Sequence, residues 1–139
     1  MELILLSHVF ITFFMTGLCW FVQVVHYPLF YQINLSEFPQ YERKNAVTAY
    51  ITVPLMIIEL LTGLYLLFIH QDYLFFSNVF FMGIIGLSTF IFQVPLHLKL
   101  MQEATNQRIK KLIFTNWIRT ISWTIRSGIL LIILSQFVN

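Results

Sequence analysis

Residues 46–69 read AVTAYITVPLMIIELLTGLYLLFI, a run in which Glu59 is the only charged side chain. A hydrocarbon core about 30 Å thick is crossed by about 20 helical residues, so this run is long enough to span a membrane. Three further apolar runs of this kind lie at 3–27, 73–98 and 112–137. Because lipid offers the backbone no hydrogen-bond partners, each run must be helical. The sequence therefore predicts an all-α polytopic membrane protein, a bundle of four transmembrane helices.

The composition indicates the same class of protein. Hydrophobic residues make up 58% of the chain and charged residues 10%, and the mean hydropathy is +0.79. These values lie outside the usual range of water-soluble domains. We expect residues 1–139 to form one membrane domain whose direct partner is the lipid bilayer, and the composition argues against a soluble enzyme or a nucleic-acid-binding protein. The single Cys19 cannot form an intramolecular disulfide.

Basic residues are distributed unevenly between the runs. Those in the two long connections are Arg43, Lys44, Lys99, Arg108, Lys110 and Lys111. The opposite side carries only Glu2 and Asp72. The excess of positive charge predicts that both long connections are cytoplasmic and both termini outside, in a bacterial inner membrane. The first run lacks a basic leading region and a small-residue cleavage site, so we expect it to be retained.

Each run carries one stripe of polar or small residues at helical spacing. The stripes are His8, Thr12, Thr16, Cys19, Gln23 and His26; Thr48, Thr52, Glu59, Thr62, Gly63 and His70; Gly83, Gly86, Gln93 and His97; and Asn116, Arg119, Trp123 and Arg126. Such residues avoid lipid, and small residues let helices approach closely. We therefore expect all four stripes to face a shared polar interior.

A helix rises about 1.5 Å per residue, which allows the depths of residues on different helices to be compared. On this scale three ionisable residues fall at one depth. We call Glu59, Arg126 and His8 the outer layer. In a structural interpretation, Glu59 and Arg126 form a buried ion pair that fixes helix register, with His8 as a hydrogen-bonding neighbour. In a functional interpretation the three are catalytic: Glu59 exchanges protons and Arg126 holds an anionic head group or carboxylate. The sequence leaves both open.

A second group of polar residues lies nearer the predicted cytoplasmic side. This inner layer, our candidate cofactor site, comprises Gln23, His26, Gln93, His97, Asn116 and Arg119. His26 and His97 could ligate the iron of haem b, with Arg119 on a propionate. They could equally bind a transition metal, with Gln23 or Gln93 completing the shell. An ordinary hydrogen-bonded core is the third alternative.

Prolines and aromatic residues suggest further local features. We expect Pro28 to close the first span, and Pro54 and Pro95 to kink the helices that contain them. Residues 36–45 have a helix-start pattern and predict a short helix at the membrane surface. Tyr27 is placed to anchor the first span at the membrane interface.

Four motifs together resemble a family of small bacterial four-helix membrane proteins with no assigned activity. They are QVVHYPLF at 23–30, PLMIIE at 54–59, QVPLH at 93–97 and NWIRTISWTIR at 116–126. The likeness covers nearly the whole chain and implies the same four-helix plan. The histidine early in the first span is similar, more distantly, to that of four-helix haem membrane proteins of the protoporphyrinogen-oxidase and copper-resistance type. No shared motif carries catalytic residues over from them.

Three classes of function agree with these features. The leading one is a small membrane redox protein that uses the inner layer for haem, metal or quinone and Glu59 for protons. The second is a proton-coupled small-molecule transporter, which with four spans would require a homo-oligomer. The third is a noncatalytic scaffold or assembly subunit whose buried polar residues only specify packing. The sequence identifies neither substrate nor reaction.

Overall fold

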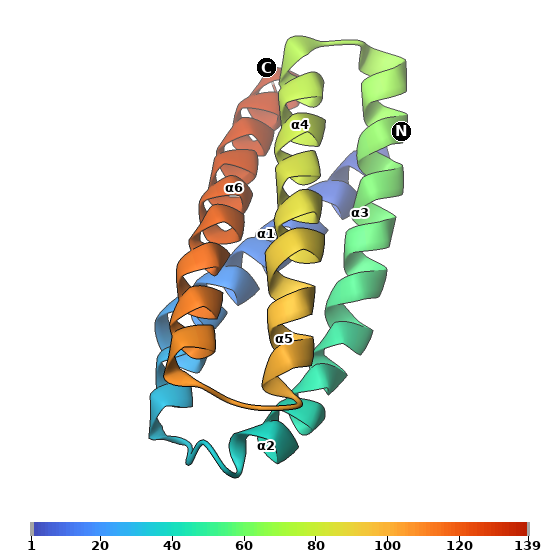
Figure 1. Cartoon of the computed structure of the whole chain (residues 1–139). Helices are drawn as coiled ribbons and strands as arrows, with labels where there is room; N and C mark the ends of the chain where they lie inside the picture. Colours follow the sequence, from blue (N-terminus) through green and yellow to red (C-terminus); the bar gives the residue numbers. More distant parts are fainter. Residues whose placement is uncertain (1, 139) are drawn as a thin grey trace.

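The computed structural model describes residues 2–138 as an all-helical bundle, which confirms the predicted all-α fold (Figure 1). In chain order the elements are α1 (Glu2–Phe21), the π-helix η1 (Val22–His26), the 3-10 helix η2 (Pro28–Gln32), α2 (Phe38–Asn45), the 3-10 turn η3 (Ala46–Thr48), α3 (Ala49–His70), α4 (Tyr73–Ser88), the π-helix η4 (Thr89–Gln93), α5 (Val94–Leu100) and α6 (Asn106–Val138). Side chains are described for residues 2–136.

Four continuous helical segments are long and apolar enough to cross a membrane, and each corresponds to one predicted run. They are Glu2–Gln32, Phe38–His70, Tyr73–Leu100 and Asn106–Gln136. Large apolar side chains cover the outward surface, including Phe68 at 77% exposure and Phe114 at 76%. Exposed aromatic groups of this size suit a lipid environment. The fourth helix begins at Asn106, before its apolar run. Its first turns carry the basic residues Arg108, Lys110 and Lys111.

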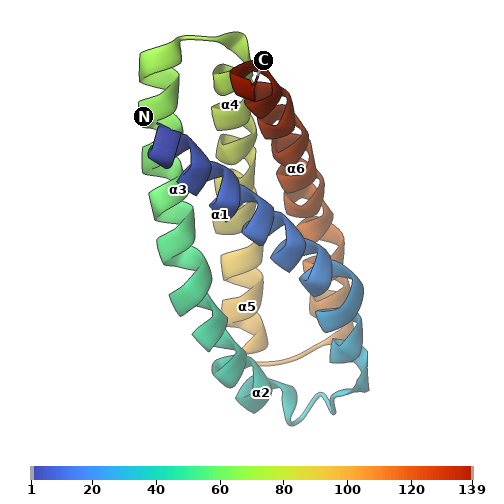
Figure 2. The same cartoon turned by 180° about the vertical axis from the view of Figure 1, so that it is seen from behind.

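The four long helices form a ring in which α1 packs on α3 and α6, and α4 packs on the same two helices. Figure 2 shows that α1 crosses the bundle obliquely, from beside α3 at its N-terminal end to beside α6 at its other end. The helices α1 and α3 therefore diverge along the bundle. As a consequence, residues 46–58 include no fully buried side chain.

Buried apolar side chains form three clusters along the bundle. The first contains Tyr27, Phe30, Phe38, Leu96, Leu100, Ala104, Ile109 and Leu112; the second Ile11, Met15, Cys19, Ile85 and Trp123; the third Leu5, Leu66, Leu74, Phe75, Leu130 and Ile133. In α1, His8 lies between Leu5 of the third cluster and Ile11 of the second. In α6, Arg126 is likewise placed between Trp123 and Leu130. The outer layer is thus a polar layer between two apolar ones.

Two π-turns widen the first and third membrane-length helices directly before a proline. The amide of Tyr27 donates to the carbonyl five residues earlier, and the amide of Val94 does the same. Pro28 and Pro95 follow. A proline has no amide hydrogen and its ring crowds the preceding turn, which accounts for the wider spacing. The helical path continues past Pro28 as η2, so this proline does not close the segment.

Two sequence-based placements need correction, and a third is confirmed. Tyr27 is only 3% exposed and lies in the bundle, so its predicted role as an interfacial anchor is wrong. Gly83 is exposed, because the inward face of α4 carries Asn78 and Met82 instead. The predicted short helix exists as α2, and Glu42 on it is 1% exposed, so α2 packs on the end of the bundle.

Gly63 is a position where α3 packs tightly against its neighbours. A Cβ atom there would lie 3.0 Å from Met82 Cε and 3.1 Å from His8 Cε1. We expect Gly63→Leu to lower stability by about 1–3 kcal/mol, because the added side chain overpacks the site. Gly83→Leu is the matched control, since a Cβ at Gly83 meets nothing within 4 Å. Thermal unfolding in detergent micelles measures both, and equal melting temperatures for the two variants would contradict the packing described above.

Candidate functional site

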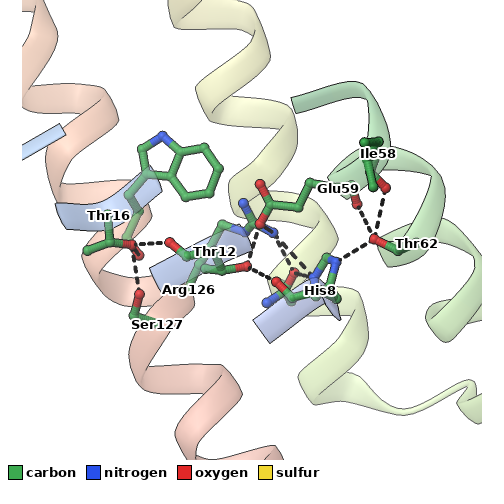
Figure 3. A network of polar contacts seen from close by, with 10 residues as sticks. His8, Thr12, Thr16, Ile58, Glu59, Thr62, Arg126 and Ser127 are labelled. Carbon is green, nitrogen blue, oxygen red and sulfur yellow. Dashed lines mark hydrogen bonds and ion pairs between the residues drawn. The ribbon is translucent and has the colours of Figure 1, made fainter. Parts of the chain in front are cut away.

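The outer layer is part of a buried polar network (Figure 3), which Asn78 of α4 joins by accepting from Arg126, so that all four long helices contribute. Arg126 Nη2 lies 2.8 Å from Glu59 Oε1 and donates to Asn78 Oδ1 at 3.1 Å. The Thr12 hydroxyl donates to the same Glu59 oxygen. Both side chains of the ion pair are 0% exposed, and His8 is 1% exposed. The predicted proximity of Glu59, Arg126 and His8 is therefore observed.

The imidazole of His8 contacts polar side chains of three other helices. Its Nε2 lies 3.2 Å from Asn78 Oδ1, an oxygen that also accepts from Arg126. Because this acceptor faces Nε2, His8 donates from that nitrogen. Its Nδ1 lies 2.8 Å from Thr62 Oγ1, whose hydroxyl also donates to the Ile58 carbonyl oxygen at 2.9 Å. A second positive charge 3.5 Å from the Arg126 guanidinium would also be repelled.

The outer layer is better built for holding helices together than for meeting a ligand. None of its residues lines the cavity described below. The guanidinium of Arg126 lies over the Trp123 ring, 4.7 Å from its centroid, which adds a cation–π contact. Arg126 Nε and Nη1 and Glu59 Oε2 have no hydrogen-bond partner, so the ion pair is not bidentate. A buried pair of this kind fixes an arrangement of helices even where it adds little stability.

The inner layer surrounds a cavity of about 280 Å³ between α1 and α3. Five of its six predicted residues line the cavity: His26, Gln93, His97, Asn116 and Arg119. The sixth, Gln23, is buried and accepts a hydrogen bond of 2.9 Å from Asn116 Nδ2. The apolar walls include Phe14, Ile51 and Val53, whose side chains are 44%, 57% and 49% exposed. The cavity therefore reaches the surface of the bundle where α1 and α3 diverge.

His97 is at the centre of a directed chain of hydrogen bonds. Its Nδ1 pairs with the buried carboxylate of Glu42, and its Nε2 lies 3.2 Å from the Tyr27 hydroxyl. Tyr27 donates to Gln93 Oε1 at 3.2 Å, and the Gln93 amide donates to Thr115 Oγ1 at 3.0 Å. Because the Tyr27 proton is directed to Gln93, His97 Nε2 donates to Tyr27. Both ring nitrogens of His97 are therefore engaged.

Arg119 is the least satisfied polar group of the cavity. Its Nη1 donates to Asn116 Oδ1 at 3.3 Å, while its Nε is buried and has no hydrogen-bond partner. His26 is better satisfied, because its Nε2 lies 3.2 Å from Asn45 Oδ1. Of the lining residues that the structure describes, Arg119 alone has a buried side-chain nitrogen or oxygen without a partner. Its guanidinium is thus available to a ligand.

Haem or metal ligation would require existing hydrogen bonds to break. His97 would have to release Tyr27 or Glu42, and the Nε2 of His26 would have to release Asn45. Within the described residues, no group of three or more His, Cys, Asp or Glu side chains is arranged to hold a metal ion. The residues predicted for haem or metal are thus near one another, but they are engaged in hydrogen bonds. Their roles as ligands remain predictions.

Several residues of the two layers were not identified from the sequence. Glu42 lies beside Arg43 and Lys44, a context typical of a solvated surface, and only its docking onto His97 distinguishes it. Asn78 had a usable signal, since it is a polar residue on the face of α4 that also carries the buried Phe75. Asparagine in an apolar run was the observation that could have identified it.

We expect the outer layer to act as one unit in stability measurements. Glu59→Met leaves Arg126 as a buried cation without a counter-charge and should destabilise the protein by about 3–5 kcal/mol. The double variant Glu59→Met and Arg126→Met should recover much of this loss, because no buried charge remains unpaired. The free energy of unfolding in detergent, measured for the unmodified protein, both single variants and the double variant, tests this expectation.

The pair Glu103 and Arg108 is the matched control, since its nitrogen and oxygen lie 3.1 Å apart and the Glu103 side chain is 71% exposed. Breaking this pair should cost about 0–1 kcal/mol. A double variant of the buried pair that is no more stable than Glu59→Met alone would contradict the pairing.

No family model, curated protein or solved structure matches this chain. The resemblance to small bacterial four-helix membrane proteins therefore remains an expectation from the motifs. Function has to be inferred from the chemistry of the two polar layers: one is closed and fully packed, and the other borders an open cavity.

Proposed function

We propose that the protein is an integral membrane protein that binds a lipid-soluble, amphipathic ligand in the cavity between α1 and α3. One observation carries this proposal: polar groups from five inner-layer residues and apolar walls meet in one cavity that reaches the bundle surface. Ligand sites are mostly apolar, with a few placed polar groups, and typically measure about 300–1,000 Å³. At about 280 Å³ this cavity suits a head group and the first part of a chain. The rest of the chain would extend between the helices into the bilayer.

Of the three cofactor classes expected from the sequence, a quinone-type ligand suits the site best. Its head group carries oxygen acceptors on an apolar tail, and Arg119 offers an unused donor. Haem or a transition metal would need lone pairs on His26 and His97, and the Nε2 of His26 and both ring nitrogens of His97 are in hydrogen bonds. The site thus supports a ligand recognised by hydrogen bonds over one recognised by coordination.

We assign the outer layer a structural role within the same proposal. Glu59 and Arg126 are 0% exposed and lie between two apolar clusters. A ligand in the cavity would have to displace this packed layer to pass along the bundle. The arrangement therefore favours binding over transport, and it favours the register-fixing interpretation of His8, Glu59 and Arg126 over the catalytic one.

The proposal includes the orientation predicted from charge. The basic residues lie on α2, at the end of α5 and at the start of α6, which meet at one end of the bundle (Figure 1). By the positive-inside rule this end faces the cytoplasm. The cavity, which Asn45 and His97 border, would then lie in the cytoplasmic half of the membrane.

Blocking the cavity tests the proposal. In nanodiscs, an azido-quinone with an isoprenoid tail should label cavity residues saturably, as read by mass spectrometry. Thr52→Trp should abolish most of this labelling, because Thr52 lines the cavity and the indole would fill it. Ile57→Trp is the control, since Ile57 lies on the same helix, is 53% exposed and is not a lining residue. Undiminished labelling of Thr52→Trp would contradict the assigned site.

An absorption spectrum and metal analysis of the purified protein separate the cofactor classes. We expect no Soret band and no stoichiometric metal after expression with ample haem precursor and trace metals, because the two histidines are held by their neighbours. His97→Ala is the variant that shows whether any Soret band depends on this histidine. A Soret band that is present in the unmodified protein and lost in His97→Ala would establish haem ligation and overturn the quinone-type proposal.

A further inference from the structure

The two buried acids among residues 2–136 each have a partner. Glu59 pairs with Arg126 at 2.8 Å, and Glu42 pairs with His97. Arg119 lines the cavity, and its guanidinium forms no ion pair within 4.0 Å with any carboxylate of residues 2–136. The Arg119 guanidinium therefore lies beside an open cavity without a carboxylate partner.

Arg119 lies too deep to share the environment of the basic residues at the start of α6. It follows Lys111 by eight residues, which places it about 12 Å farther along the helix. Its Nε is buried without a partner, and its one hydrogen bond is to Asn116 at 3.3 Å. An arginine at membrane depth is costly unless a counter-charge or water meets it.

We propose that the missing counter-charge is supplied by the ligand, a single-chain amphiphile with a phosphate or carboxylate head group bound by Arg119. This inference rests on the proposed function, since it assigns the head group of the ligand in that cavity. Guanidinium donors match both oxyanions in bidentate geometry, and charge-assisted hydrogen bonds are the strong ones. A quinone and an anionic amphiphile both carry oxygen acceptors on an apolar tail, but only the anionic head group also gives Arg119 a counter-charge.

The surroundings of Arg119 are suited to an anion. Glu42, the buried acid at this end of the bundle, is not a lining residue; it is bonded to His97 and accepts from Asn45 Nδ2 at 3.4 Å. No carboxylate of the described residues lines the cavity. The small volume, about 280 Å³, accommodates a single chain more readily than a two-chain lipid.

The test uses the full chain in phosphatidylcholine nanodiscs, whose lipids carry no net charge. Two photoreactive probes share one alkyl chain and end in a phosphate or in an alcohol. We expect the phosphate probe to label cavity residues about tenfold or more above the alcohol probe. Arg119→Gln should remove this preference and Arg119→Lys should retain part of it. Arg108→Gln, an arginine change on the same helix outside the cavity, should leave it intact.

Each outcome decides a separate point. Full competition by inorganic phosphate would show that the site takes a free anion, which overturns the amphiphile. Equal labelling by the two probes, or a preference that survives in Arg119→Gln, overturns the anionic head group but leaves the proposed function standing. If neither probe labels saturably while the unmodified protein shows a cooperative melt, the proposed function fails as well.

Discussion

The ion pair between Glu59 and Arg126 is the constraint on which the rest of the structure depends. A charge buried at this depth cannot be left without a partner, so α3 and α6 are held where a carboxylate oxygen and a guanidinium nitrogen lie 2.8 Å apart. Thr12 and Asn78 bond to the same two groups and bring in α1 and α4. Apolar clusters on both sides of this layer exclude alternative registers, since a shift would bury a charge among hydrocarbon side chains.

The outer layer fixes one half of the bundle. In the other half the helices are packed less closely. The oblique path of α1 brings it beside α6 and away from α3, and a cavity remains between α1 and α3. The two π-turns lie in this half, next to the polar residues that border the cavity. Glu42 on α2 bonds to His97 and so fixes the short helix across the end of the bundle. A packed layer and an open site thus result from one set of four helices.

The sequence allowed the helices and the outer layer to be predicted, because charged residues in long apolar runs are rare and their depths can be compared. It placed the inner-layer residues near one another, but it did not identify their partners. Helical spacing assumes about 3.6 residues per turn, and a π-turn rotates everything that follows it. This helps explain why Tyr27 was assigned to the membrane interface, whereas the structure buries it against His97. Glu42 had no local signal, since its burial depends on a contact with a helix distant in sequence.

The stretch of α3 before Glu59 has a mechanical consequence. Beyond Glu59 the helix is anchored, but residues 46–58 have no fully buried side chain that would resist bending. Pro54 lies in this stretch and removes one backbone hydrogen bond, which lowers its stiffness. The stretch is therefore held at both ends, by the pairing of Glu59 with Arg126 and by that of Glu42 with His97, and is less constrained between them. A small bend of this stretch would widen or narrow the lateral entrance of the cavity, while the packed layer around Glu59 would keep its shape.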